Sequence, residues 1–201
     1  MAYRENNLWK VGFGKLNEDS GNFLVSYEAT FNPQSKECKI LTYEDPQKNS
    51  GFYFNAAKAF KKMLGVAPHE YPPYNFAVLP ADSDNLLIYF YPAQTKWDNY
   101  RLGGDIKYIY NIPKGEITDS LRMHNRILLM PYTKREDQEA QSSYSTAILT
   151  STPVETDILY VLSRKFPAEH YVLTQEWVFS LTPEGKIVKI PTEEFLKLKS
   201  K

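Results

Sequence analysis

Proline residues place the strongest limit on the fold of this chain, because they divide it into short segments. The 201 residues include 13 prolines, and a proline inside a helix removes a backbone hydrogen bond and clashes with the preceding turn. Pro68 follows a segment with helical spacing, Pro92 follows an apolar strand segment, and Pro167 follows a second helical segment. The chain is therefore expected to form short strands and two or three short helices.

Extended segments separated by turn residues occupy most of the chain. Residues 23–31 are rich in aromatic and β-branched side chains, and residues 39–43 can pair with them after a turn. The segment 86–91 is apolar throughout, which is typical of a strand buried on both faces. The segment 117–130 is long, so we expect a break near Asn125. Further strands are expected at 75–79, 105–110, 144–150, 171–174, 176–181 and 186–190.

Three segments have helical features. Residues 55–64 carry apolar and small side chains at helical spacing, with Asn55 as the expected N-cap, and their alanines would allow close packing on a sheet. Residues 152–155 have the form of a capping box with proline at the first helical position, so a second helix is expected there. A last, charged helix is expected at 193–199, because its acidic residues come first and its lysines last.

Together these segments predict an α+β fold with a mixed, mostly antiparallel sheet and two or three helices, because most of the connections are short. The length fits a single α+β domain over residues 1–201. Within it, residues 133–143 form the most polar stretch, which is expected to be a loop between two halves of the chain or a short exposed helix.

Composition excludes several classes of protein. Lys and Arg number 24, as do Asp and Glu, so the formal charge is zero. No nucleic-acid partner is therefore expected, because phosphate binding needs an excess of basic residues. One cysteine excludes a disulfide within the chain, and no apolar run reaches the roughly 18 residues of a membrane span. The polar N-terminus indicates a cytoplasmic chain, or a periplasmic or secreted one in which Met1 has replaced a signal peptide.

The histidines and the cysteine form no familiar catalytic or metal-binding motif. His69, His124 and His170 are far apart, whereas zinc ligands often lie two or four residues apart on one element. No metal and no cofactor is therefore expected. His124 could be a general base, but two nearby arginines would lower its pKa, so we expect an ordinary hydrogen-bonded histidine on a strand. His170 is expected at the surface or in a hydrogen bond, and Cys38 is expected in the packed interior.

The segment 71–110 has an unusual density of aromatic side chains. Strand alternation places about half of them in the core. The others, together with nearby basic residues, could form a surface that stacks on bases or sugars. Gly103 and Gly104 are the only paired glycines and predict a tight turn or bulge. The expected binding residues are Trp97, Tyr100, Arg101 and Asp105.

The block from Tyr144 to Ile190 has a distinctive order of features. A short strand is followed by a Ser/Thr-Pro segment, by Thr156 and Asp157 at the start of a helix, and then by the run His-Tyr-Val-Leu-Thr, a strand and a Pro-Glu-Gly-Lys turn. This order resembles the second half of the JAB/MPN (JAMM-type) metallopeptidase-like fold. In that family a strand carries an HxHP motif, and an S-x-x-D some residues later helps complete the zinc site. Asp157 would match that aspartate.

The chain departs from this family at the metal ligands. Ser145 and Ala147 stand where the two histidines would fall, and Val154 stands where the serine would fall. Hydroxyl and methyl groups cannot replace imidazoles as zinc ligands. The resemblance therefore implies an inactive relative.

A second resemblance, carried by the runs at 92–95 and 103–105 and by His124, is to bacterial proteins of no assigned function and implies no activity.

Because no catalytic constellation is present, the sequence predicts a non-catalytic domain that binds a protein or a small ligand. The alternative is a metal-dependent hydrolase with a rearranged site built on His124 and Asp157, with Glu28 or Glu44 as an upstream carboxylate. A third possibility is a structural or assembly protein, which would form a stable oligomer through a large apolar interface.

Overall fold

The computed structural model describes residues 1–66, 73–96, 99–131, 142–164 and 168–199. Internal contacts divide the chain into two compact units, each made of several separate segments. Unit 1 comprises Met1–Glu70, Phe76–Phe90 and Lys107–Leu121, and unit 2 comprises Tyr71–Asn75, Tyr91–Ile106 and Arg122–Lys201. Most of the loop expected at 133–143, and Trp97, lie outside the described residues.

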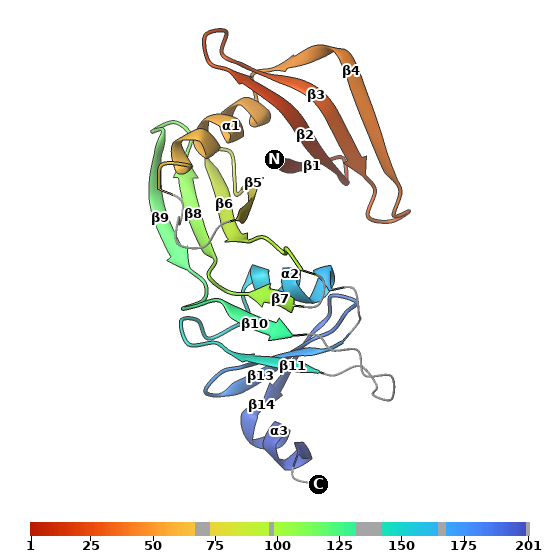
Figure 1. The fold of residues 1–201 in the computed structure, drawn as a ribbon, viewed down its shortest axis with the longest axis vertical. Coiled ribbons are helices and arrows are strands. Elements are labelled where there is room, and N and C mark those ends of the chain that lie inside the picture. The colour runs from red at the N-terminus through yellow and green to blue at the C-terminus, as the bar shows by residue number, and fades with distance from the viewer. Residues whose placement is uncertain (67–72, 97–98, 132–141, 165–167, 200–201) are drawn as a thin grey trace. The chain divides into compact units, whose positions relative to one another are not determined.

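The first sheet of unit 1 is an antiparallel meander in the order β1-β2-β3-β4 (Figure 1). The predicted pairing of 23–31 with 39–43 is confirmed, since Tyr27 lies opposite Thr42. Cys38, which was expected in the interior, is exposed instead. The reason is that it begins an edge strand whose residues are nearly all exposed. The strands are β1 (Ala2–Glu5), β2 (Leu8–Asn17), β3 (Asn22–Phe31) and β4 (Cys38–Asn49).

Helix α1 (Phe52–Met63) packs against this sheet through Tyr53, which is 1% exposed. The helix begins three residues before the predicted start, because the side chain of Asn49 accepts a hydrogen bond from the Tyr53 N–H at 3.3 Å. The Tyr53 ring lies directly against Gly12, where a Cβ would come within 2.5 Å of the ring. The buried positions Ala56 and Ala59 confirm the close packing expected from the small side chains.

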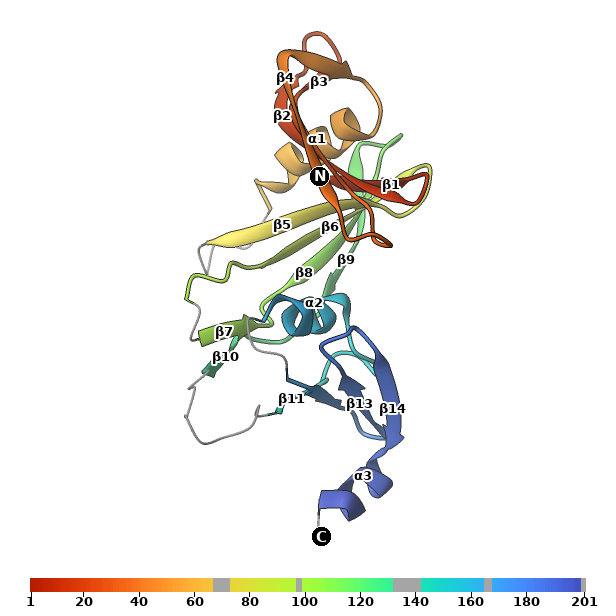
Figure 2. The same cartoon turned by 90° about the vertical axis from the view of Figure 1, so that its right-hand side faces the viewer.

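A second antiparallel sheet follows in the order β5-β6-β8-β9 (Figure 2). Ile88, Tyr89 and Phe90 are consecutive and all buried, so β6 is covered on both faces as predicted. Phe60 of α1 stacks on Phe76 of β5, with ring centroids 3.7 Å apart. The strands are β5 (Tyr74–Pro80), β6 (Asn85–Pro92), β8 (Ile106–Asn111) and β9 (Glu116–Arg122).

Unit 2 combines a two-stranded antiparallel pair, β7 and β10, with a sheet in the order β11-β12-β13-β14. Strands β11 and β12 run parallel, and helix α2 connects them, whereas the other pairs are antiparallel. Tyr100 and Leu102 of β7 pack with Tyr160 of α2 and Val172 of β12 in one core cluster. The elements are β7 (Asn99–Leu102), β10 (Leu128–Pro131), β11 (Ser143–Thr146), α2 (Glu155–Ser163), β12 (His170–Leu173), β13 (Trp177–Leu181), β14 (Ile187–Pro191) and α3 (Thr192–Lys199).

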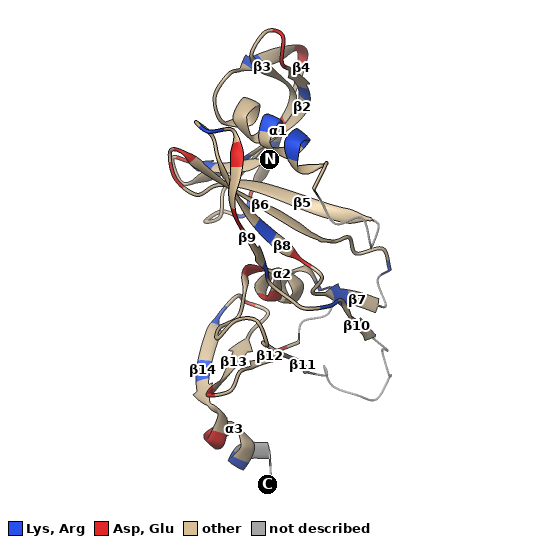
Figure 3. Cartoon of the chain, turned by 90° about the vertical axis from the view of Figure 1, so that its left-hand side faces the viewer, with Lys and Arg blue, Asp and Glu red and all other residues tan. Residues whose placement is uncertain are grey.

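The described residues therefore have a mixed α+β architecture with three helices and mostly antiparallel sheets, as the sequence predicts. The expected break near Asn125 is confirmed, because β9 ends at Arg122 and β10 begins at Leu128. Basic and acidic residues are interspersed along the chain (Figure 3). Lys61 and Lys62 lie in the last turn of α1, where cations suit the helix dipole. No described helix has the length and apolar character needed to cross a bilayer.

Candidate functional site

The first turn of α2 holds a buried carboxylate that belongs to a charged network. Asp157 is 2% exposed, and its Oδ2 accepts a hydrogen bond of 2.9 Å from the N–H of Val154, the residue just before the helix. This bond satisfies one of the free N–H groups at the helix start. The helix therefore begins at Glu155, two residues after Pro153, and not at the capping box predicted from residue 152. The second oxygen, Oδ1, lies 3.0 Å from Nε2 of His124.

His124 bridges two carboxylates. Its Nδ1 lies 2.8 Å from Oδ1 of Asp105, which is 1% exposed, while its Nε2 faces Asp157. The hydroxyl of Thr156 donates to the other oxygen of Asp105. Both nitrogens of the imidazole and all four oxygens of the two carboxylates therefore have polar partners within unit 2. We call Asp105, His124, Asp157 and Thr156 the acid–histidine network.

The charge of His124 follows from these contacts. Burial by itself would lower the pKa of His124, but the hydrogen bonds and negative charges of Asp105 and Asp157 outweigh it and raise the pKa to about 10. The ring is therefore an imidazolium at neutral pH, and both N–H groups donate. The expected lowering by nearby arginines is wrong, because Arg122 and Arg126 are exposed while the two carboxylates are in contact. The expected strand position is also wrong, since His124 lies between β9 and β10.

Two glycines allow the network to assemble. Gly103 and Gly104, in the link between β7 and β8, have φ of 87° and 70°, in the left-handed region that favours glycine. The expected tight turn or bulge is not found at these residues. A Cβ at Gly103 would come 2.4 Å from the carbonyl oxygen of Arg126 and 2.9 Å from Cβ of His124. The bare backbone thus lets the glycine segment approach the His124 segment, and the N–H of Met123 donates to the Asp105 carbonyl at 3.1 Å.

Two cavities of unit 2 border the acid–histidine network. The first has a volume of about 210 Å³ and is lined by Asp105 and Thr156 together with three tyrosines. The second has a volume of about 400 Å³ and is lined by His124 and Asp157 together with Ser145. We call them the tyrosine pocket and the serine cavity.

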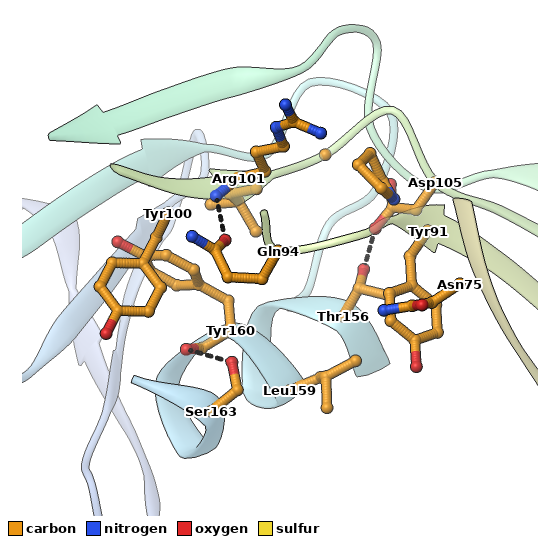
Figure 4. A pocket seen from close by; sticks show the side chains of 13 residues that line it. Asn75, Tyr91, Gln94, Tyr100, Arg101, Asp105, Thr156, Leu159, Tyr160 and Ser163 are labelled. Atoms are coloured by element: carbon orange, nitrogen blue, oxygen red, sulfur yellow. Dashed lines mark hydrogen bonds between the residues drawn. The ribbon is translucent and has the colours of Figure 1, made fainter. Parts of the chain in front are cut away.

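The tyrosine pocket gathers three of the four residues predicted to bind a ligand: Tyr100, Arg101 and Asp105 (Figure 4). All three offer little to a ligand directly, since Asp105 is 1% exposed and both of its oxygens bond within the acid–histidine network. Tyr100 is only 3% exposed. The guanidinium of Arg101 donates to the carbonyl of Ala93 at 3.2 Å, and Figure 4 shows it pointing away from Leu159.

Other residues of the tyrosine pocket, which sequence reasoning did not select, are more available. The amide of Asn75 and the hydroxyl of Tyr91 have no hydrogen bond to another described residue, and Leu159 adds an exposed apolar side chain. In Figure 4, Asn75 and Tyr91 lie on the opposite side of the pocket from Tyr160.

Ser145, which lines the serine cavity, belongs to a second cluster around a histidine. His170 is fully buried, with Ser145 Oγ 3.0 Å from its Nε2 and Ser143 Oγ 2.9 Å from its Nδ1. The guanidinium of Arg164 donates to Ser143 Oγ at 3.0 Å. Of the two expectations for His170, the hydrogen bond is confirmed and the surface position is wrong, because the ring packs edge-on to Tyr160, 5.1 Å away. The alternation Ser-x-Ser on β11 was the only signal of this cluster in the sequence.

His170 is neutral at physiological pH, unlike His124. Burial is the main cause of a lowering of its pKa to about 4, and the positive charges of Arg164 and His124 add to it. The negative charge of Asp157 acts in the opposite direction. The two histidines of unit 2 thus hold opposite protonation states, because only His124 touches carboxylates.

The two glutamates that the sequence offered as upstream carboxylates do not belong to the same unit as His124 and Asp157. Glu28 and Glu44 belong to unit 1, where Glu28 accepts a hydrogen bond of 3.2 Å from the hydroxyl of Tyr53. Within the ranges that the structure describes, no group of three or more His, Cys, Asp or Glu side chains is arranged to hold a metal ion. The double engagement of His124 is consistent with this, since a protonated ring has no free lone pair.

Comparison with known proteins yields no match: no protein-family model, no curated protein and no solved structure is similar to this chain.

Proposed function

We propose that unit 2 binds a small polar molecule that contains a ring, such as a sugar or a nucleobase, in the tyrosine pocket. The observation that carries this proposal is the pocket itself, in which the available amide of Asn75 and hydroxyl of Tyr91 lie across from the ring of Tyr160. The rings of Tyr91 and Tyr160 line the same pocket, and aromatic rings stack on the flat faces of sugars and bases.

The size and polarity of the pocket favour a small ligand. Its volume of about 210 Å³ is below the about 300–1,000 Å³ of most small-molecule pockets. The amide of Asn75 and the hydroxyl of Tyr91 supply donors and acceptors that a polar ligand can use. Asp105 and Thr156 belong to the acid–histidine network, whose hydrogen bonds hold this wall of the pocket in place. Little ordering of side chains would therefore accompany binding.

The test is a titration of the whole chain with a panel of monosaccharides and nucleosides, followed by two-dimensional NMR or calorimetry. Tyr91→Ala is expected to weaken binding by about 5- to 150-fold, since loss of one stacking contact costs about 1–3 kcal/mol. Asn75→Ala is expected to weaken binding because it removes the amide that can bond to the ligand. Tyr27→Ala, which removes an exposed tyrosine of unit 1, is the matched control. Tyr100→Ala is unsuitable, because removing a buried core tyrosine destabilises the fold.

Failure of every member of the panel to shift a signal from the tyrosine pocket would contradict the proposal. Capture of a folded protein through the same residues would instead favour a protein partner.

We also propose that the chain is a relative of the JAB/MPN fold without its zinc chemistry. Supporting this, Asp157 lies in the first turn of a helix that connects two parallel strands, and it lines the serine cavity together with Ser145 and Ala147. Metal analysis of the tag-free protein, purified without chelator, tests it. Zinc well below one equivalent is expected. A stoichiometric metal ion that is lost in His124→Ala would contradict the proposal and support the hydrolase alternative.

A further inference from the structure

We propose that Ser145 is a nucleophile, activated by His170, that accepts the acyl group of a small ester or thioester in the serine cavity. This goes beyond ligand binding in the tyrosine pocket and depends on different residues. The geometry that points to it is the hydrogen bond of 3.0 Å between Ser145 Oγ and His170 Nε2, at the wall of a cavity of about 400 Å³.

The arrangement has the three parts of an activated serine. The nucleophile and the base are within hydrogen-bond distance, and a third group orients the base. Here the third group is Ser143, whose Oγ lies 2.9 Å from Nδ1 of His170 and is itself held by Arg164. Parallel pairing of β11 with β12 creates this geometry, because it places Ser143 opposite His170 and Ser145 opposite Val172 on the same face of the sheet.

One tautomer of His170 is required. With the proton on Nδ1, that N–H donates to Ser143 Oγ, and Nε2 is free to accept the hydroxyl proton of Ser145. Ser143 can take this role because its oxygen accepts a second hydrogen bond, from Arg164, and has two lone pairs.

The charges around His170 define how strong a base it is. Burial disfavours its charged form, and the charges of Arg164, which follows α2, and of His124, between β9 and β10, act in the same direction. The carboxylate of Asp157 on α2 stabilises the imidazolium that forms when the proton is transferred. The base is therefore weak but present in its active, neutral form across the physiological range.

The serine cavity supplies groups for the acyl oxygen. Arg126 and Asn125 also line it, and both are exposed side chains with N–H donors. A guanidinium or amide donor near the reacting carbon stabilises the negative charge that develops on the carbonyl oxygen. The apolar remainder of the lining, including Leu128 and Val172, suits a short acyl chain.

The reaction balances without any further reagent. Ser145 Oγ forms a bond to the carbonyl carbon, while its proton passes to Nε2 of His170. The bond from that carbon to the ester oxygen or thioester sulfur then breaks, and the leaving alcohol or thiol takes the proton from Nε2. Water repeats the sequence: it gives a proton to Nε2, attacks the acyl carbon and releases the carboxylic acid, and Ser145 regains its proton.

The experiment is labelling of the whole chain with a fluorophosphonate, which phosphonylates an activated serine and releases fluoride. Intact-mass analysis and peptide mapping are expected to show one adduct, on Ser145. Ser145→Ala should abolish it, and His170→Gln should slow it at least about 100-fold, the usual contribution of a general base. Ser142→Ala, which removes an exposed serine next to β11, is the matched control and should label at the normal rate.

Two further measurements separate a base from a merely structural histidine. The labelling rate should stay constant from pH 8 to pH 6 and fall only towards pH 4, because the pKa of His170 is about 4. Nitrogen-15 NMR should show the proton of neutral His170 on Nδ1.

Absence of an adduct on Ser145 in the folded protein, shown by circular dichroism, would overturn the proposal. The proposal would also be overturned if His170→Gln were labelled as fast as the parent chain. A proton on Nε2 of neutral His170 would overturn it as well. Tyr91→Ala should label normally, so the two proposals fail independently.

Discussion

The charged state of His124 makes a specific prediction about stability and pH. The pKa of His124 is about 10 in the folded chain and about 6.5 in an unfolded one. A pKa that is raised on folding stabilises the folded state fully below the unfolded value, and this contribution disappears as the pH rises through the folded value. Unit 2 should therefore lose stability between pH 6.5 and pH 10.

The magnitude follows from the same two pKa values. Linkage gives a contribution of at most about 5 kcal/mol near pH 6, of which about 2 kcal/mol is lost by pH 8 and about 2 kcal/mol more by pH 10. His124→Gln removes the titrating group and leaves Asp105 and Asp157 without their cation. At neutral pH this should cost about 3–5 kcal/mol, as for other buried ion pairs that lose one member.

Urea unfolding at pH 6, 8 and 10 measures this effect. Trp177 packs against the core cluster of unit 2, so its fluorescence reports on that unit once Trp9 and Trp97 are replaced by Phe. Tyrosines and lysines also titrate near pH 10, so the relevant quantity is the difference between the parent chain and His124→Gln. That difference should shrink by about 4 kcal/mol from pH 6 to pH 10. A difference that is constant with pH would refute the assignment of a buried imidazolium between two carboxylates.

Two smaller predictions test the packing of each unit by thermal unfolding. Gly103→Ala should lower the melting temperature more than Gly21→Ala. Both residues have positive φ, but a Cβ at Gly103 would lie 2.4 Å from the Arg126 carbonyl oxygen, whereas at Gly21 nothing lies within 4 Å. Equal losses of melting temperature would mean that the glycine segment does not pack against the His124 segment. Tyr53→Phe should cost about 1–2 kcal/mol, because it removes the hydroxyl that donates to Glu28 at 3.2 Å; an unchanged melting temperature would show that this hydrogen bond contributes nothing to stability.

Local patterns were sufficient for much of the fold. The helix at α1 and the strands at β3 and β6 could be predicted because spacing, turn residues and prolines act over a few neighbouring positions. The helix boundaries were less predictable. The side chains of Asn49 and Asp157 accept hydrogen bonds from backbone N–H groups at the helix starts. Both residue types are also common in loops, so the sequence alone does not select them for this role. Strands β1 and β2 were missed, because their apolar and polar residues alternate weakly.

The candidate site could be predicted only in part. Tyr100, Arg101 and Asp105 lie within six residues of one another, so a dense aromatic segment was enough to select them. Asp105 and Asp157, the partners of His124, lie 19 and 33 residues away from it in the sequence. Ser143 and Ser145, the partners of His170, lie on β11, which pairs in parallel with β12 and is connected to it through α2. Contacts of this kind follow from topology, which no local pattern of residues specifies.

The interleaving of the two units has a consequence for synthesis on the ribosome. The segment that carries β7 is made before residues 107–121 complete unit 1, yet its partners in unit 2 come much later. Tyr100 of β7 must wait for Tyr160 of α2, and at about 5–20 residues per second this delay is about 3–12 s. During that interval the apolar side chains of β7 have no native partner from α2. Cells that slow translation should therefore expose this strand longer to chaperones and to other nascent chains.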